Sequence, residues 1–264
     1  MSWLRDLGST GISVSALGLG TVKLGRDQGV KYPRDFSIPD DKSAAELLAR
    51  ARDLGINLID TAPAYGNSEQ RLGQLLAGQR DHWVICSKVG EEFEAGRSHF
   101  DFSPEHTRAS VQRSLQRLAT DAIDIVLVHS DGNDLHIIEE LGTLEALAEM
   151  KQEGLLRAFG MSTKTVAGGL DAAAHSDVVM LTYNLEQRGE KPVLDACASL
   201  GKGALIKKAL ASGHLAEDYV DPVQASMDLV FGHPATSAAI IGTINPANLA
   251  ANVRAVQRSL SNLA

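Results

Sequence analysis

The chain has 264 residues, of which 44% are hydrophobic and 22% charged, which is the composition of an ordinary globular protein. A formal net charge of −8 and the lack of any basic run of five or more residues argue against nucleic acid or an anionic membrane surface as the main partner. No segment reaches the roughly 18 consecutive apolar residues of a membrane span, and no secretion signal opens the sequence, so we expect a cytoplasmic protein. Cys86 and Cys197 lie in separate apolar runs, which indicates buried thiols rather than a disulfide or a metal pair.

Short apolar runs rich in Val, Ile and Leu alternate along the chain with longer segments of helical periodicity. The predicted strands cover residues 16–21, 57–62, 83–89, 124–130, 158–163, 178–184, 204–209 and 238–243. The predicted helices cover residues 43–54, 68–77, 104–119, 142–153, 165–174, 191–200, 222–231 and 246–257. Eight strand–helix units in strict alternation predict a parallel sheet covered by helices, and eight is the number that closes a (β/α)8 TIM barrel. Because no linker divides the sequence, we expect one α/β domain over residues 1–264.

Capping signals mark the start of several predicted helices. At positions 103–104, 221–222 and 245–246 a capping side chain precedes a proline, and proline suits the first helical position. Ser43 and Glu46 have the spacing of a capping box, which predicts that the first long helix begins at Ser43.

The alternative architecture is an open, doubly wound sheet. It is supported by Gly18 and Gly20 after an apolar run, which match the start of a dinucleotide-binding fingerprint. The third glycine of that fingerprint is missing, because Lys23 occupies its position, and residues 24–40 indicate a loop rather than a helix. We therefore favour the barrel, with residues 5–15 predicted to form a hairpin across its bottom.

Ionisable side chains follow three consecutive predicted strands, at the barrel end where chemistry takes place in this architecture. Asp60, Lys88 and His129 occupy these strand ends, and Tyr65 follows Asp60 in the next loop. Asp60 and Lys88 can offset the cost of burial by pairing with each other. A lysine ammonium lowers the pKa of a neighbouring phenol, so we expect Tyr65 to act as a general acid, with His129 hydrogen-bonded to the same substrate oxygen.

What these strand ends lack is also informative. They present no nucleophile–base dyad and no cluster of His or carboxylate side chains with metal-ligand spacing, so we expect no metal site. A site that protonates an oxygen and has no nucleophile of its own suits reduction of a carbonyl by an external hydride.

The residues now resemble the aldo-keto reductase family. The segment DTAPAYGNSEQRLG at 60–73 is similar to the family signature, and the segments LGSTGISVSALGLGT, ICSKVG, RSLQRLATDAIDIVLVHSDG, KQEGLLRAFGMST, GALIKKALASGHL and IIGTINPANLAANV occur in family order. The resemblance covers essentially the whole chain. It implies the catalytic tetrad Asp60, Tyr65, Lys88 and His129 and a nicotinamide cofactor extended across the barrel mouth.

The resemblance also implies the residues that contact the cofactor. They are Thr21 and Val22 on the first strand, Asp60, Ser162 and Thr163 near the nicotinamide, Leu210 and Ser212 over the pyrophosphate, and Gly242, Thr243, Asn248 and Asn252 toward the adenosine.

The chain departs from the family at several of the matching positions. Met180 replaces a common glutamine and Lys207 an aromatic that stacks on the nicotinamide, so Lys207 or Lys208 would contact the pyrophosphate or form a solvated strand end. Gly242 and Asn248 replace a Lys and an Arg of many NADP-preferring members, which removes two charge partners of a 2′-phosphate. Backbone N–H groups at the start of the last helix still favour a phosphate, so we expect NADP(H) to be slightly favoured over NAD(H).

Loops at the barrel mouth predict a small-molecule carbonyl substrate without identifying it. The loops 23–42, 91–102 and 131–138 carry aromatic and polar side chains that suit a hydroxylated carbonyl as well as an aromatic aldehyde. Because the sequence ends at Ala264, soon after the last predicted helix, we expect the family's C-terminal tail to be essentially absent. The sequence does not determine the oligomeric state and is compatible with a monomer.

Two other functions remain open. A cofactor-binding sensor or regulatory protein would keep the fold and turn over little substrate. A class I aldolase would form a Schiff base on Lys88, but that chemistry needs a lowered lysine pKa, and pairing with Asp60 would raise it.

Overall fold

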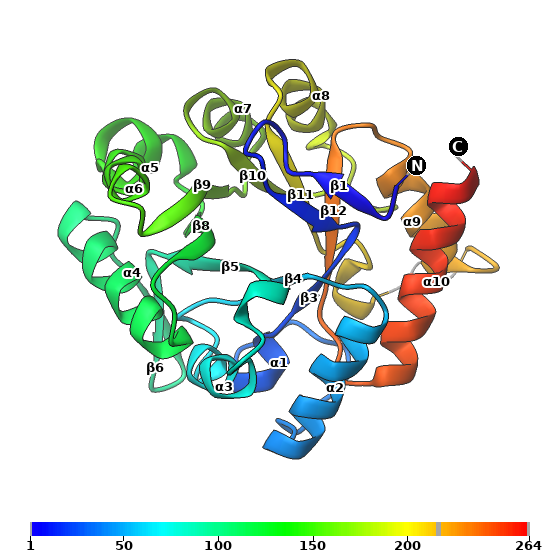
Figure 1. Cartoon of the computed structure of the whole chain (residues 1–264). Helices are drawn as coiled ribbons and strands as arrows, with labels where there is room; N and C mark the ends of the chain where they lie inside the picture. The colour runs from blue at the N-terminus through cyan, green and yellow to red at the C-terminus, as the bar shows by residue number, and fades with distance from the viewer. Residues whose placement is uncertain (1, 215–217, 263–264) are drawn as a thin grey trace.

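Eight parallel strands close a barrel in the computed structural model, which describes residues 2–214 and 218–262 (Figure 1). The strands are β3 (Leu17–Gly20), β4 (Leu58–Asp60), β5 (Val84–Val89), β8 (Ile123–His129), β9 (Leu156–Ser162), β10 (Val178–Thr182), β11 (Gly203–Lys207) and β12 (Thr236–Ile241). Each strand pairs in parallel with the next along the chain, and β12 closes the ring on β3, with Ala239 opposite Leu17. The predicted barrel is confirmed, and the open sheet is excluded.

Helices surround the barrel in an outer ring (Figure 1). They are α2 (Asp41–Asp53), α3 (Ser68–Leu75), α4 (Pro104–Leu118), α6 (Thr143–Gln152), α7 (Val166–His175), α8 (Lys191–Leu200), α9 (Pro222–Phe231) and α10 (Pro246–Asn262). Ser103, Asp221 and Asn245 each accept a hydrogen bond from a backbone N–H two or three residues further on, as their caps predict. The Ser43 capping box is wrong: the cap is Asp40, whose Oδ1 accepts from the backbone N of Ser43 at 2.8 Å.

Short elements lie outside the ring of strands and helices. The predicted N-terminal hairpin is present as β1 (Leu4–Asp6) and β2 (Ser13–Ser15). The predicted loops are partly regular, because they contain α1 (Val22–Gly25), α5 (Asp134–Glu140) and an antiparallel hairpin of β6 (Glu91–Glu94) and β7 (Arg97–Phe100). The last hairpin turns at Ala95 and Gly96, which both have positive φ, as a two-residue turn of type I′ requires. Single 3-10 turns occur at Arg80–His82 and Ala211–Gly213.

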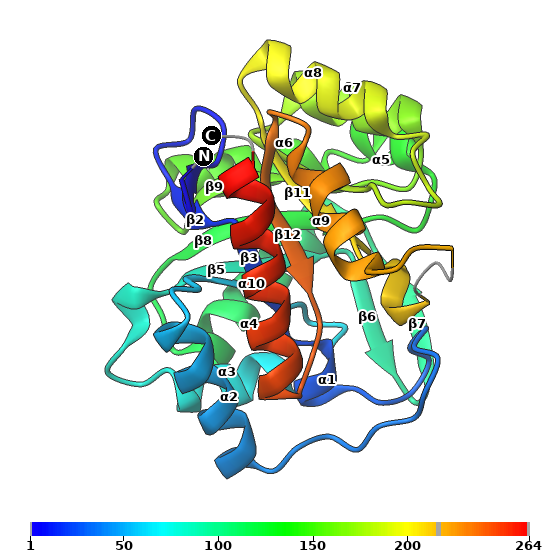
Figure 2. The same ribbon diagram turned by 90° about the vertical axis from the view of Figure 1, so that its right-hand side faces the viewer.

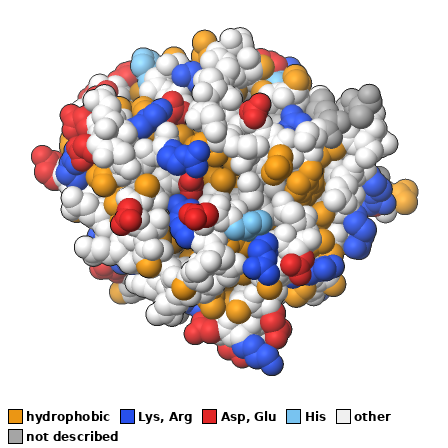
Figure 3. Space-filling view, in the orientation of Figure 1, with side chains coloured by type: hydrophobic (Ala, Val, Ile, Leu, Met, Phe, Trp, Pro, Cys, Tyr) orange, Lys and Arg blue, Asp and Glu red, His pale blue; other side chains and the backbone are white. Residues whose placement is uncertain are grey.

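The two hairpins lie at opposite ends of the barrel (Figure 2). The β1–β2 hairpin lies at the end where both termini are found, and β6–β7 projects from the other end. On the face shown in Figure 3, acidic, basic and apolar side chains are interspersed rather than gathered into one patch. Within residues 2–214 and 218–262, no helix combines the length and the apolar character that crossing a membrane requires.

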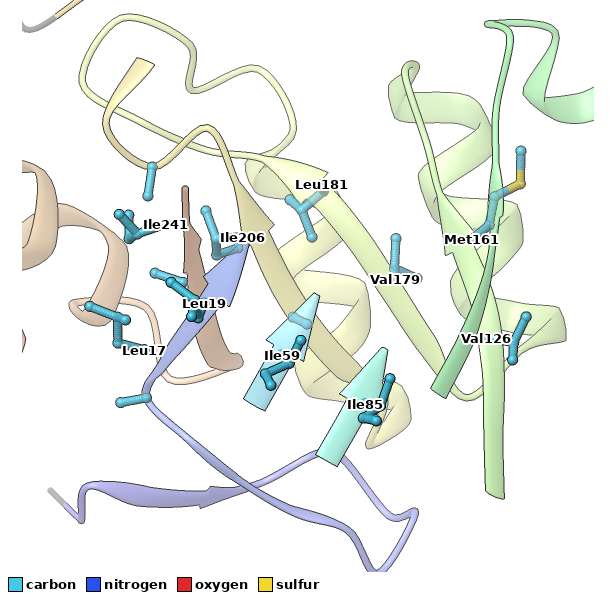
Figure 4. Close-up of a cluster of buried hydrophobic side chains, with 14 of the residues drawn as sticks. Leu17, Leu19, Ile59, Ile85, Val126, Met161, Val179, Leu181, Ile206 and Ile241 are labelled. Atoms are coloured by element: carbon cyan, nitrogen blue, oxygen red, sulfur yellow. The ribbon is translucent and has the colours of Figure 1, made fainter. Parts of the chain in front are cut away.

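The barrel strands bury side chains on both of their faces. The outward-facing set, which packs under the helices, includes Ile59, Ile85 and Val126 (Figure 4). The inward-facing set forms a second core, closed below by Leu7, Ile12 and Val14 of the N-terminal hairpin segment; its strand members include Leu58, Cys86, Ile125 and Leu127. Cys86 and Cys197 are buried free thiols.

Strict alternation along these strands decides where the functional side chains lie. Asp60 is two residues after inward-facing Leu58, and Lys88 is two residues after inward-facing Cys86. His129 follows Leu127 in the same way. All three side chains therefore lie above the inner core, at the C-terminal ends of adjacent strands.

Candidate active site

Asp60 and Lys88 form a buried ion pair at the base of the site. Lys88 Nζ lies 2.5 Å from Asp60 Oδ1 and donates a second hydrogen bond of 2.8 Å to the carbonyl of Thr61. The two side chains are 5% and 2% exposed, so almost no water screens the pair. Burial alone would lower the pKa of Lys88, but Asp60 and Tyr65 outweigh burial and raise it. The predicted pairing is confirmed, and Lys88 stays charged.

Tyr65 lies between this pair's ammonium and the His129 ring, in contact range of both. Its ring centroid is 4.9 Å from Lys88 Nζ and 6.2 Å from the His129 ring, which it meets edge-on at 86°. Burial raises the pKa of Tyr65, and Lys88 opposes that rise without cancelling it. The expectation that the Tyr65 pKa is lowered is therefore wrong. Burial destabilises the phenolate more than the Lys88 ammonium stabilises it. Tyr65 therefore holds its proton at neutral pH.

His129 is the fourth side chain at this end of the cavity. Its Nδ1 lies 2.8 Å from Glu91 Oε2, and the His129 side chain is 22% exposed. Burial lowers the pKa of His129, and Glu91 acts in the opposite direction. The net result is a lowered pKa of His129, because burial outweighs Glu91.

A cavity of about 1400 Å³ opens above these residues. It is lined by all four members of the predicted tetrad and by nearly all of the predicted cofactor contacts, namely Val22, Ser162, Thr163, Lys207, Lys208, Leu210, Ser212, Gly242, Thr243, Asn248 and Asn252. Thr21 is the exception: it is buried in the wall, where its hydroxyl donates to the Asp60 carbonyl at 2.9 Å and accepts from Ser68 Oγ. Thr21 thus supports the backbone of Asp60 and does not face the cavity.

The charge of the cavity differs from the charge of the whole chain, which is −8. Among the described lining residues the acidic ones are Asp60, Glu190 and Asp221. The basic ones are Lys23, Lys31, Arg34, Lys88, Lys164, Lys207, Lys208 and Arg258. An excess of cations in a large cavity fits an anionic ligand with a pyrophosphate, so the residues present fit a nicotinamide dinucleotide.

Lys207, the last residue of β11, lines the cavity beside the end of β9. Its Nζ donates to Ser162 Oγ at 2.9 Å and to the Thr163 carbonyl at 2.6 Å. Burial lowers the pKa of Lys207 to about 8, against the opposing effect of Glu190. Lys207 is therefore not a solvated strand end, and its ammonium is directed at Ser162, which was expected to lie near the nicotinamide.

The Tyr32 hydroxyl lies close to the backbone of Gly242. A Cβ placed on Gly242 would lie 2.7 Å from the Tyr32 hydroxyl. The Tyr32 ring is held by Lys23, whose Nζ is 3.7 Å from the ring centroid, and by an edge-on contact with Phe36. The loop after α1 thus lies against the end of β12, the strand that pairs with β3. The sequence indicated Tyr32 as a mouth aromatic, but its contact with Gly242 is visible only in the structure.

Glu91 is the functional candidate that sequence reasoning missed. It stands three residues after Lys88, just past the end of β5. That position just past a barrel strand is the signal that could have found it.

Comparison with known proteins gives the same family that the sequence motifs resemble. The Aldo/keto reductase family matches residues 16–229. A crystal structure of an aldo-keto reductase from Pseudomonas aeruginosa superimposes with a TM-score of 0.89 at 58% identity, covering 97% of this chain and 95% of that one. L-galactose dehydrogenase of Arabidopsis thaliana is 34% identical over 81% of this chain and 67% of its own length. NADH-specific methylglyoxal reductase of Escherichia coli is 32% identical over 81% of this chain and 70% of its own length. The chain belongs to the aldo/keto reductase family.

Proposed function

We propose that this protein reduces a small aldehyde or ketone, or oxidises the matching alcohol, with Tyr65 as the general acid or base. The observation that carries the proposal is the buried Lys88–Asp60 pair beside Tyr65 at the floor of a large cationic cavity. Such a pair holds a positive charge next to the phenol at every pH of interest, and a binding protein has no need of it.

Each member of the tetrad has a distinct role in this proposal. Asp60 keeps Lys88 charged and oriented. Tyr65 donates its proton to the substrate oxygen, and Lys88 then stabilises the phenolate that Tyr65 becomes. His129 orients the same oxygen from the other side. A bound nicotinamide cofactor supplies the hydride for the carbonyl carbon. No group of three or more potential metal ligands occurs within residues 2–214 and 218–262.

The raised pKa of Lys88 argues against the aldolase alternative, because an ammonium is not a nucleophile. The sensor alternative is tested with a panel of aldehydes offered with NADPH and NADH in parallel. We expect turnover with at least one small carbonyl. Micromolar cofactor binding without turnover across the panel would favour the sensor.

For the substrate we propose a small oxygen-rich carbonyl compound or its alcohol. L-galactose and methylglyoxal, which appear in the names of the two relatives, are both of this kind. The panel should therefore include short dicarbonyls and aldoses beside aromatic aldehydes. We further propose that the whole chain acts as one barrel domain in the cytoplasm, without a nucleic-acid or membrane partner.

For the cofactor we propose a slight preference for NADP(H) over NAD(H). The dipole at the start of α10 favours a 2′-phosphate, although Asn245 already accepts from the backbone N–H groups of Ala247 and Asn248. Asn248 brings no charge, and a side chain at position 242 would meet the Tyr32 hydroxyl. A backbone contribution alone is worth about 0.3–1 kcal/mol when exposed. The preference should therefore be small.

Replacing Asn248 with Arg is expected to tighten NADPH binding by roughly tenfold, because a hydrogen bond to a charged group adds about 1.5–3 kcal/mol. NADH, which has no 2′-phosphate, should bind almost as before. Fluorescence titration of both cofactors measures the change. Ala247→Arg is the matched control, because Ala247 is an exposed neighbour on α10 that does not line the cavity. Equal tightening of NADPH and NADH, or the same effect in the control, would contradict the assignment of Asn248 to the 2′-phosphate.

A further inference from the structure

Glu91 is carried to His129 by a turn directly after β5. Gly90 has a φ of +98° and lies so close to Phe102 that a Cβ would meet its ring at 2.4 Å, so the chain turns sharply here. The turn places Glu91 at the start of β6, above the neighbouring strand β8. Glu91 Oε2 lies 2.8 Å from Nδ1 of His129, and the Glu91 side chain is 12% exposed.

The carboxylate of Glu91 is fixed by groups other than His129. Ser98 on β7 donates a hydrogen bond of 2.6 Å to Oε1, and Nη1 of Arg26 lies 3.7 Å from the same oxygen. Arg26 is itself stacked 3.4 Å above the ring of Phe93. Burial would raise the pKa of Glu91, but His129, Ser98 and Arg26 outweigh burial and lower it to about 2. Glu91 is therefore ionised, with Oε1 engaged and Oε2 directed at the imidazole.

An ionised carboxylate has no proton to donate, so it favours a proton on the nitrogen that faces it. Nδ1 of His129 should thus carry its hydrogen in both charge states. Among the described residues Nδ1 has no hydrogen bond of standard geometry, so its link to Glu91 Oε2 is the electrostatic contact at 2.8 Å. Nε2 is left for the cavity that His129 lines beside Tyr65. It is a lone pair when the ring is neutral and an N–H when the ring is an imidazolium.

We propose that Glu91 is a positioning residue that fixes the tautomer of His129, so that the charge of His129 selects which partner of the carbonyl–alcohol pair the site binds. The proposal rests on the function proposed above. An imidazolium donates from Nε2 to a carbonyl oxygen, which then has two donors, Tyr65 and His129. A neutral ring presents a lone pair to that oxygen, which repels a carbonyl and accepts the O–H of an alcohol.

The groups that face His129 determine the direction of the pH dependence. Glu91 on β6 favours the imidazolium, whereas Lys88 on β5 and Lys207 on β11 disfavour it, as burial does. Tyr65 contributes the edge of a ring that is neutral in this pH range. Removing the charge of Glu91 therefore lowers the pKa of His129 further. The carbonyl-binding form should then persist only at lower pH, unless the ring is free to adopt the other tautomer.

Glu91→Gln removes the charge and keeps the shape, and an amide can either accept from Nδ1 or donate to it. The neutral ring can then present an N–H at Nε2. In the wild type we expect the KM for a carbonyl substrate to rise about tenfold between about pH 5 and pH 8. The rise is expected because His129 loses its charge, and with it one charge-assisted hydrogen bond to the carbonyl. In the variant this rise should be about absent. Glu92→Gln is the matched control, since Glu92 is the next residue on β6 and pairs with Arg113 and His106 instead.

A second measurement decides the tautomer without any turnover. In protein labelled with ¹⁵N-histidine, long-range ¹H–¹⁵N correlation identifies which nitrogen of His129 carries the proton, and the signal that disappears in His129→Gln assigns it. We expect a protonated Nδ1 in the wild type and a lower imidazolium pKa with loss of the fixed tautomer in Glu91→Gln. A wild-type ring protonated on Nε2, or spectra and KM profiles unchanged by Glu91→Gln, would overturn the role of Glu91. Absence of turnover in every variant, with the expected spectra, would instead contradict the proposed function.

Discussion

Replacing Tyr65 with Phe is expected to remove most carbonyl reduction, by about 10²–10⁴-fold, while cofactor affinity stays nearly unchanged. Only the hydroxyl is lost, because a Phe ring can keep the edge-on contact with His129 and the position beside Lys88. Steady-state kinetics and a fluorescence titration of NADPH separate the two effects. Tyr183→Phe is the control: Tyr183 is buried just past β10 and does not line the cavity, so turnover should be unaffected. Loss of cofactor binding comparable to the loss of rate would mean that Tyr65 is a packing residue.

Replacing Lys88 with Met should lower the rate and also destabilise the fold. The change leaves Asp60 buried without its partner, and breaking such a pair costs about 3–5 kcal/mol of the free energy of unfolding. Because Lys88 holds the pKa of Tyr65 below the value that burial alone would give, the optimum for any residual alcohol oxidation should move to higher pH. Urea unfolding and a pH–rate profile measure the two effects.

A double variant separates chemistry from stability. Asp60→Asn combined with Lys88→Met removes both charges, so the free energy of unfolding should recover most of the loss. The rate should not recover, since no cation remains beside Tyr65. Recovery of activity in the double variant, or an unshifted pH profile in Lys88→Met, would contradict the coupling of Lys88 to Tyr65.

The sequence predicts the barrel and the tetrad for a local reason. Alternation along a strand is a property of neighbouring residues, so Leu58 and Cys86 facing inward fix where Asp60 and Lys88 lie. Strand order then brings His129 to the same end of the barrel. These three positions follow from alternation once the strands pair in chain order.

The remaining features depend on distances between loops, which the sequence does not contain. Glu91 reaches His129 only because the chain turns at Gly90 and pairs with β7, and Tyr32 meets Gly242 only because the loop after α1 folds back against the end of β12. The direction of the Tyr65 pKa shift depends on how far water is excluded, and Lys88 alone suggested the opposite sign. The cap of α2 is a local matter instead: Asp40, three residues before Ser43, accepts the hydrogen bond from the Ser43 backbone N–H, so the helix begins earlier than the Ser43 signal predicted.

Hydride transfer is tested most directly with a reduced cofactor that carries deuterium at the transferable position of the nicotinamide. The protein is incubated with this cofactor and a small oxygen-rich aldehyde, and the products are examined by mass spectrometry. We expect one deuterium in the alcohol for each cofactor oxidised, and almost none with Tyr65→Phe. Cofactor that binds tightly, remains reduced and leaves the aldehyde unlabelled would show that this barrel binds a nicotinamide without using it.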